Sequence, residues 1–351
     1  MISLCIITKN NQETIEKCIN SVKSIIGEII LADTGSTDNT IKIAENFGAK
    51  IFHFKWNNNF SDAKNFAKSQ ATGNWILNLD ADETIAEQDL EKIKNLAEIT
   101  EFIGFSFIQR NYRNGIGLFS SISCTGDKYE ESKVSSCFIP RRMIRFFRNL
   151  PEIGFEGAVH DSVEFSILKC GKIMETEIPI HHFGMLSRSN ERTRMYIDIE
   201  KKNIKDDYFQ YYQIGIQLHS INETDEALDF LSKSLDKNPD FYLAWLEKGI
   251  IFLEQGKIYE AEQALKMAEK KGSHEMIFSH LGIIYSILQN YSSSINYFLK
   301  ALSINPKNAD THFNLGLTYK NTGNIEQAKK EFALAVYLNS VYKEKLKSLF
   351  Q

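Results

Sequence analysis

A regular spacing of glycines in the second half of the chain constrains its fold most strongly. Gly215, Gly249, Gly282 and Gly316 are separated by 34, 33 and 34 residues. Twelve positions after each glycine stands a small residue, and sixteen positions after it a large apolar one: Ala227, Ala261, Ser294 and Ala328, then Leu231, Leu265, Phe298 and Phe332. This period predicts a repeated pair of helices that cross at small residues. In an irregular helical bundle, the spacing of such residues would not stay constant to within one residue over four units.

The repeat resembles the tetratricopeptide unit, a helix-turn-helix of 34 residues. Asn238-Pro239 and Asn305-Pro306 fall where a unit should end. We therefore expect a tetratricopeptide-repeat domain over residues 206–351, with about four repeats and a capping helix over 341–350. Such repeats bind extended peptides along a concave face.

The first half alternates segments of strand and helix character. Strands are predicted over 3–8, 28–33, 50–54 and 75–79, and helices over 14–25, 38–47 and 60–71. This order is typical of βαβ units with a mostly parallel sheet, so residues 1–205 are expected to form an α/β domain. Parallel sheets bind ligands at the carboxyl ends of their strands, where Asp33 and Asp80 are placed.

Three carboxylates follow the strand over 75–79, in the segment Asp80-Ala81-Asp82-Glu83. Like charges this close repel one another, so a cation is expected to offset them. A hard divalent ion that also holds a diphosphate is the natural candidate. The alternative is a solvated helix N-terminus, where acidic residues are favoured in any case. Glu83 itself is interpreted as a helix-start residue.

Composition excludes several classes of protein. With 43% hydrophobic and 25% charged residues the 351-residue chain has material for two globular cores. A net charge of −4 argues against a general nucleic-acid binder. No apolar run reaches the roughly 20 residues that span a bilayer, so no transmembrane segment is expected. The five cysteines show no metal-ligand spacing and are interpreted as reduced thiols of a cytoplasmic protein.

Several motifs together resemble the family 2 glycosyltransferases. They are the opening Ile6-Ile7-Thr8-Lys9-Asn10, the turn Asp33-Thr34-Gly35-Ser36-Thr37-Asp38 and the strand end Asp80-Ala81-Asp82. The turn taken alone has another explanation, since Ser or Thr capping a helix accounts for most such sequences. The resemblance implies a GT-A fold, a nucleotide-sugar donor and a divalent metal, Mn or Mg.

A narrower resemblance follows from Trp56-Asn57-Asn58-Asn59-Phe60-Ser61-Asp62-Ala63-Lys64-Asn65 and from later blocks that include Phe155-Glu156-Gly157-Ala158-Val159-His160-Asp161 and His182-Phe183-Gly184. These are similar to a subgroup with bacterial surface-glycan transferases and bacteriocin S-glycosyltransferases of the sublancin type, whose members also carry helical repeats. The subgroup usually has Asp at position 59, Arg at 64 and Glu at 161. Lys64 keeps the charge but loses the planar fork of arginine.

The resemblance assigns roles to individual residues. Thr8, Asn10, Asp33 and Lys64 would surround the nucleoside, with Asp80 and Ala81 completing the nucleotide-sugar site. Asp82 would bind metal and diphosphate, and His182 is a candidate further ligand, with ordinary packing at a strand end as the alternative. Asp161 is the candidate base, which His160 either orients or replaces. The resemblance also places a loop or hairpin that meets the acceptor at residues 111–138. From their spacing alone, Arg145 and Arg148 would either steady the diphosphate or lie on a solvated strand face.

The implied function is an inverting, metal-dependent transfer of a sugar from a nucleotide-sugar, with a UDP-hexose as the expected donor, to a Cys or Ser/Thr side chain of a peptide or protein. The repeats would hold that acceptor. One alternative is a lipid-linked or surface-glycan acceptor, in which case the repeats would dock a partner or form a homodimer. The other is an inactive scaffold, against which intact Asp80, Asp82, His160, Asp161 and His182 argue.

Overall fold

The computed structural model describes residues 1–113, 122–124, 126–159, 161–184, 186, 190–339 and 341–349. The chain divides into two compact units, the second of which includes everything from Asn190 onward. The helix α6 (Asn190–Lys202) precedes the boundary predicted at residue 205, and its Ile197 belongs to the apolar core of the first repeat.

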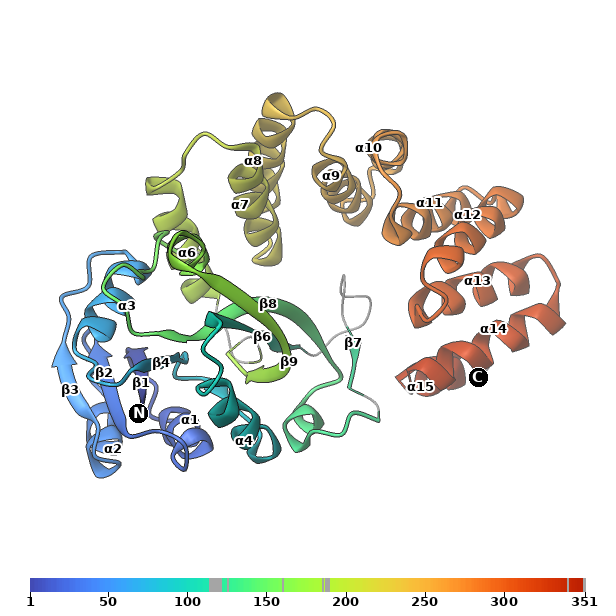
Figure 1. Ribbon diagram of the computed structural model, residues 1–351. Helices are drawn as coiled ribbons and strands as arrows, with labels where there is room; N and C mark the ends of the chain where they lie inside the picture. Colours follow the sequence, from blue (N-terminus) through green and yellow to red (C-terminus); the bar gives the residue numbers. More distant parts are fainter. Residues whose placement is uncertain are drawn as a thin grey trace. The chain divides into compact units, whose positions relative to one another are not determined.

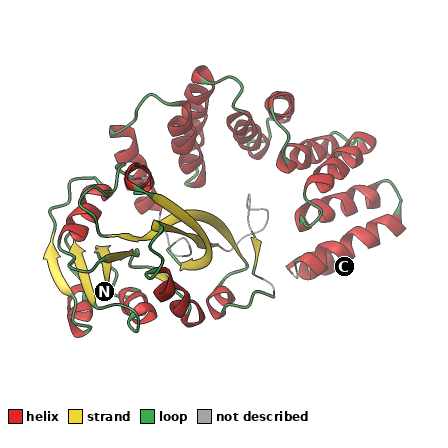
Figure 2. Ribbon diagram, viewed as in Figure 1, coloured by secondary structure: helices red, strands yellow, loops and turns green. Residues whose placement is uncertain are grey.

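The first unit is built on one mixed sheet (Figures 1 and 2). Its strand order is β3-β2-β1-β4-β8-β6-β9-β5, with β7 paired to β8. The strands β3, β2, β1 and β4 are parallel, as the alternating pattern predicts, whereas β4 meets β8 antiparallel. The bounds are β1 (Ile2–Thr8), β2 (Glu28–Asp33), β3 (Lys50–His53), β4 (Trp75–Asn78), β5 (Glu83–Thr84), β6 (Phe102–Arg113), β7 (Ile122–Ser123), β8 (Cys137–Arg148) and β9 (Lys172–His182).

Helices cover both faces of this sheet because each carries one apolar face. The residues Ile15, Ile19 and Ile93 of α1 and α4 join one core with β1, and Ala67 and Ile167 of α3 and α5 join the core on the opposite face. The bounds are α1 (Ile15–Val22), α2 (Thr40–Asn46), α3 (Phe60–Ser69), α4 (Glu87–Leu96), the 3₁₀ helix η1 (Glu130–Val134) and α5 (Glu164–Cys170). The α/β prediction for the first half is confirmed.

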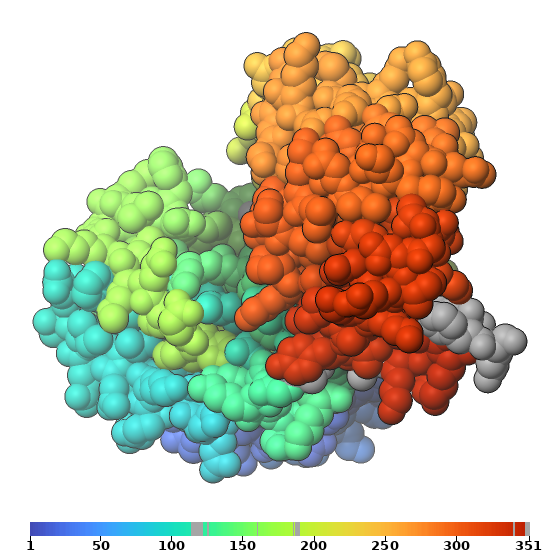
Figure 3. Space-filling model, turned by 90° about the vertical axis from the view of Figure 1, so that its right-hand side faces the viewer, coloured from blue at the N-terminus to red at the C-terminus, as the bar shows by residue number. Residues whose placement is uncertain are grey.

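The second unit is a succession of helix pairs, as the 34-residue period predicts (Figure 1). The bounds are α7 (Tyr208–Ser220), α8 (Thr224–Lys237), α9 (Tyr242–Glu254), α10 (Ile258–Lys271), α11 (Glu275–Ile287), α12 (Tyr291–Ile304), α13 (Ala309–Asn321) and α14 (Ile325–Leu338). Figure 3 shows the later repeats following one another in chain order from orange to red.

Close packing explains the small and large residues of the period. A methyl group added at Gly215 would lie 2.9 Å from Leu231, and one added at Gly282 would lie 2.6 Å from Phe298. Each repeat glycine therefore leaves room for the large residue sixteen positions later. The helices of each pair approach closely at this point.

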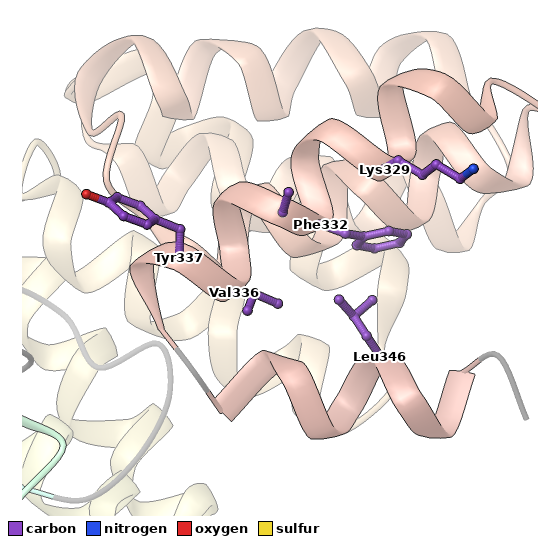
Figure 4. Close-up of a pocket in the computed structure, with 6 residues that line it drawn as sticks. Lys329, Phe332, Val336, Tyr337 and Leu346 are labelled. Carbon is purple, nitrogen blue, oxygen red and sulfur yellow. The ribbon is translucent and has the colours of Figure 1, made fainter.

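The predicted terminal helix is α15 (Val341–Leu349). Tyr342 of α15 packs on Phe313 with ring centroids 4.6 Å apart. A pocket of about 640 Å³ lies between α14 and α15 (Figure 4), and its lining is mostly apolar: Lys329, Phe332, Ala333, Val336, Tyr337 and Leu346. This pocket contains none of the residues that the sequence assigns to chemistry.

Part of the expected acceptor loop over 111–138 lies outside the described residues, namely 114–121 and 125. Its described parts include the end of β6, the short strand β7, the helix η1 and the start of β8. None of the helices in the described part of the chain is long and apolar enough to cross a membrane.

Candidate active site

Asp80 lies just beyond β4, and an arginine on the adjacent strand β8 binds it. The Nη2 of Arg145 is 2.7 Å from Oδ2 of Asp80 and 2.7 Å from Oε1 of Glu83, and its Nη1 is 3.1 Å from Oδ1 of Asn78. The antiparallel register of β4 and β8 places Leu77 opposite Phe146, which brings Arg145 to the strand end. The side chain of Arg145 is only 2% exposed.

The solvated-strand alternative for Arg145 is therefore wrong, because its guanidinium is buried among the acids of the strand end. Arg148, the second arginine of this pair, stacks on the ring of Trp75, with its guanidinium carbon 4.2 Å from the ring centroid. The cation expected to offset the crowded carboxylates is thus supplied in part by the chain itself. Burial alone would raise the pKa of Asp80, but Arg145 and Lys64 lower it well below its ordinary range.

Glu83 is not a helix-start residue, and that prediction is wrong. It lies in the two-residue strand β5 and is fully buried. Its Oε2 accepts the backbone N–H of Asp80 at 2.8 Å, while Oε1 accepts from Arg145 and from Gln109. Burial raises the pKa of Glu83, and the charge of Asp80 adds to this effect, so that together they outweigh the charge of Arg145. Glu83 therefore shapes the turn that presents Asp80 and Asp82.

Lys64 joins the candidate base to the acidic strand end. Its Nζ is 2.7 Å from Oδ2 of Asp161 and 3.3 Å from Oδ1 of Asp80. The lysine is 4% exposed and lies on α3, which covers this face of the sheet. Burial alone lowers its pKa, but the charges of Asp161 and Asp80 outweigh burial and raise it. Residues 97 positions apart in the sequence thus share one partly buried ion pair.

The pairing of β5 with β9 brings His182 to Asp82. Glu83 lies opposite His182 in this antiparallel register, and the N–H of Phe183 donates to the carbonyl of Asp82 at 3.1 Å. As a result, Nε2 of His182 is 3.4 Å from Oδ1 of Asp82. Burial lowers the pKa of His182, but the hydrogen bond and charge of Asp82 raise it overall. His182 is therefore packed at a strand end, and this packing places its ring next to Asp82.

Asp82 and His182 are the residues that fit a divalent metal. A methyl group at Gly184 would lie 2.1 Å from Oδ2 of Asp82 and 2.9 Å from Nε2 of His182, so this glycine keeps the space beside both atoms open. No cluster of three or more His, Cys, Asp or Glu in ligand geometry occurs among the described residues. A pair is enough for Mg²⁺ or Mn²⁺ when substrate phosphates and water complete the shell.

Three of the four residues assigned to the nucleoside, Thr8, Asn10 and Asp33, lie at or just beyond the ends of β1 and β2, whereas Lys64 lies on α3. The side chains of Asp33 and Asn10 bind the turn between β2 and α2. The carboxylate of Asp33 is 2% exposed and accepts the backbone N–H groups of Gly35 at 3.1 Å and of Ser36 at 3.1 Å. The side chain of Asn10 accepts the N–H of Thr37 at 2.8 Å, and the hydroxyl of Thr8 donates to Asn11 at 2.9 Å. The contacts of Asp33 and Asn10 fix the shape of this turn, and the contacts of all four residues with a nucleoside stay a prediction.

Ala81 lies between the two acids and is 4% exposed. His160 lies outside the described residues, so its expected role also stays a prediction. Three residues with a clear part in the cluster were missed by the motifs: Asn78, Gln109 and Asn111. Each is an amide in a largely buried strand, and an amide buried in a strand needs a hydrogen-bond partner. This signal could have pointed to them.

The sequence matches known families in both units. Residues 3–158 match the model of glycosyl transferase family 2, and residues 277–308 and 297–330 match models of the tetratricopeptide repeat.

Curated relatives show the same two parts. The chain is 34% identical over 167 residues to a TPR repeat-containing protein of Synechococcus elongatus. This match covers 48% of this chain and 36% of the relative. It is 28% identical over 251 residues to the SPbeta prophage-derived glycosyltransferase SunS of Bacillus subtilis. This match covers 67% of this chain and 53% of SunS. An uncharacterized glycosyltransferase of Rickettsia felis is 44% identical over 93 residues, 26% of this chain and 32% of that relative.

The matches span about a third to a half of the length of these relatives. Together with the family models, they show that this chain joins a domain of glycosyl transferase family 2 to tetratricopeptide repeats.

Proposed function

We propose that the chain is an inverting, metal-dependent glycosyltransferase that moves a hexose from a nucleotide-sugar, with a UDP-hexose as donor, to a Cys, Ser or Thr side chain of a peptide or protein. The observation that carries this proposal is the ion-pair chain from Asp161 through Lys64 to Asp80. It ties the candidate base to the acidic strand end where the donor diphosphate would lie. Asp82 stands two residues further along the same turn, where His182 of β9 meets it.

The residues present suit a single displacement. The acceptor oxygen or sulfur would attack the anomeric carbon, Asp161 would take the acceptor proton, and the bond to the diphosphate would break with its electron pair leaving on the nucleoside diphosphate. A metal held by Asp82 and His182 would neutralise charge on that leaving group. Lys64 holds Asp161 by a 2.7 Å contact and so fixes the direction in which its carboxylate points.

A thiol acceptor asks less of the base than a hydroxyl does, because the pKa of a thiol is far lower. The repeats support a polypeptide acceptor, since stacked helix pairs offer an extended surface for a peptide. His160 stays the alternative base or the residue that orients Asp161.

The test begins with a thermal-shift screen of nucleotide-sugars with Mn²⁺ or Mg²⁺, followed by intact-mass analysis of Cys- and Ser/Thr-containing peptides incubated with the donor that binds. The expected result is a mass gain of one hexose that needs the metal. Asp161→Asn should lower transfer by about 10²–10⁴-fold, the usual contribution of a general base, without weakening donor binding. Asp82→Asn should weaken metal binding and abolish the metal-dependent transfer.

Glu101→Gln is the matched control, because Glu101 is an exposed carboxylate that pairs with Lys172 at 2.9 Å in the same unit. It should leave transfer unchanged. Transfer to a lipid-linked acceptor with no peptide modified would overturn the polypeptide acceptor. Absence of both donor binding and donor hydrolysis would overturn the enzyme itself and favour a scaffold.

A further inference from the structure

We infer that Asn111 is a positioning residue that fixes the ring orientation and the tautomer of His182, so that the Nε2 lone pair faces Asp82 and is ready for a cation. This inference rests on the proposed metal role of Asp82 and His182. Asn111 begins the segment that was expected to meet the acceptor, but no motif assigns it to the donor or metal site.

Strand pairing places Asn111 between two neighbours. It lies on β6, which runs between β8 and β9 (Figure 1). In the β6–β9 register Asn111 is directly opposite His182, and in the β6–β8 register it is opposite Ile139. Directly opposed residues point to the same face of a sheet. The amide of Asn111 is therefore held beside the imidazole by the backbone pairing.

Two hydrogen bonds determine which way the amide faces. The Nδ2 of Asn111 is 3.2 Å from the carbonyl oxygen of Ile139, which can only accept. Nδ2 must therefore donate there, which leaves Oδ1 toward the imidazole at 2.7 Å from Nδ1 of His182. Because an amide oxygen can only accept, Nδ1 of His182 must carry a proton.

The tautomer follows for Nε2. In the neutral ring only one nitrogen is protonated, so Nε2 keeps its lone pair. That lone pair is 3.4 Å from a carboxylate oxygen of Asp82. Two electron-rich atoms at this separation are stabilised by a cation that both can bind, a metal ion or a proton. Metal-binding histidines commonly donate their second N–H to a partner that fixes the ring, and Asn111 occupies that position here.

The first measurement uses the wild-type protein without metal. ¹⁵N-histidine NMR, with His182→Ala to assign the signal, should show the neutral His182 ring protonated at Nδ1. A neutral ring protonated at Nε2 would overturn the inference. In Asn111→Leu, which has no acceptor, the signal should move toward a mixture of tautomers, while Asn111→Asp keeps an acceptor and should keep the Nδ1–H form.

The second measurement is Mn²⁺ affinity in the presence of a nucleoside diphosphate, followed by the EPR signal of free Mn²⁺. Asn111→Leu should weaken binding about 10–100-fold, the usual effect of losing a partner of a metal-bound histidine, and Asn111→Asp should restore most of it. In the His182→Ala background Asn111→Leu should have no further effect. Equal losses with and without His182 would show a merely structural role and overturn the inference.

The two measurements separate this inference from the proposed function. If the wild-type protein binds no Mn²⁺ while NMR shows the Nδ1–H form controlled by Asn111, the orientation of His182 stands and the proposed metal dependence fails. If Mn²⁺ binds tightly in wild type and equally tightly in a soluble, folded Asn111→Leu, the metal dependence stands and the role of Asn111 fails.

Discussion

The guanidinium of Arg145 lies 2.7 Å from the carboxylate of Glu83, and both side chains are buried, with exposures of 2% and 0%. This ion pair comes from two strands that are not neighbours in the sheet. The Nη2 atom of Arg145 that contacts Glu83 also contacts Asp80, in the turn that carries Asp80 and Asp82. The acidic turn therefore depends on an internal cation as well as on any metal that it binds.

Removal of this internal cation should be costly. Arg145→Met leaves Asp80 and Glu83 buried without their arginine, and we expect the free energy of unfolding to fall by about 3–5 kcal/mol. Adding Glu83→Gln removes one of the stranded charges and should recover about 1 kcal/mol or more, because contacting residues couple. Urea unfolding of the single and double variants measures both values. Strictly additive losses would contradict a direct pairing of Arg145 with Glu83.

Lys64 should matter for the rate through Asp161. In Lys64→Met the carboxylate of Asp161 loses its 2.7 Å contact, and a misplaced base can lower the rate about 10²-fold. Lys64→Arg keeps the charge and should stay within about tenfold of wild type. Steady-state transfer assays, with donor affinity measured separately, check both variants. A wild-type rate for Lys64→Met would show that Lys64 does not position Asp161.

The open space beside Asp82 and His182, the proposed metal ligands, should be sensitive to one methyl group. In Gly184→Ala the new Cβ would lie 2.1 Å from Oδ2 of Asp82, so either the carboxylate or the backbone must move. We expect Mn²⁺ affinity to fall by about tenfold or more, on the scale of other disturbances around metal ligands. Isothermal titration calorimetry with a nucleoside diphosphate present measures this.

Gly154→Ala is the matched control for that experiment, because its Cβ would meet only an ordinary 3.4 Å contact with Asn65. Its Mn²⁺ affinity should equal that of wild type. Equal affinity in Gly184→Ala as well would mean that the space beside Asp82 is not used by the metal.

The repeats should lose stability when a glycine at a helix crossing is enlarged. In Gly282→Ala the Cβ would lie 2.6 Å from Phe298, and overpacking typically costs about 1–3 kcal/mol. The better helix propensity of alanine offsets up to about 1 kcal/mol, so a net loss of about 1–2 kcal/mol is expected in chemical unfolding. Gly282→Ala combined with Phe298→Leu should recover part of it, and a stable single variant would contradict the close packing.

The stability of the repeats should also depend on pH through His219. The hydrogen bond to Glu247, at 2.6 Å, raises the pKa of His219 to about 9, opposed by burial and helped by Glu254 at 2.8 Å. His280 also faces these carboxylates, and burial lowers its pKa. The pKa of an unfolded histidine is about 6.5. The stabilisation from His219 is therefore complete below about pH 6.5 and is lost as pH rises toward 9.

We expect this contribution to reach about 1–2 kcal/mol, a discounted value because Glu254 is 59% exposed and solvent screens its charge. The difference in unfolding free energy between wild type and His219→Gln should shrink steadily from pH 6 to pH 9.5, since glutamine does not titrate. A difference that stays constant with pH would show that His219 is not charged in the folded protein.

The local pattern of the sequence determined most of the fold. Alternating strands and helices predicted the parallel strands β1 to β4, and the glycine spacing predicted the helix pairs from α7 to α14. Both patterns arise from the period of the backbone and from close packing between segments that are near in the sequence. Such periods can be seen in one sequence without a structure. The sequence pattern by itself also placed Asp80 and Asp82 at the end of a strand.

The tertiary structure alone decided what surrounds those acids. Glu83 was expected to start a helix, but pairing of β5 with β9 buries it against Arg145. The contact of Lys64 with Asp161 joins residues 97 positions apart, and that of Asn111 with His182 joins residues 71 apart. Such contacts depend on strand order and register across the sheet, which no local spacing encodes. The sequence located the acids, and the fold selected the cations and amides that hold them in place.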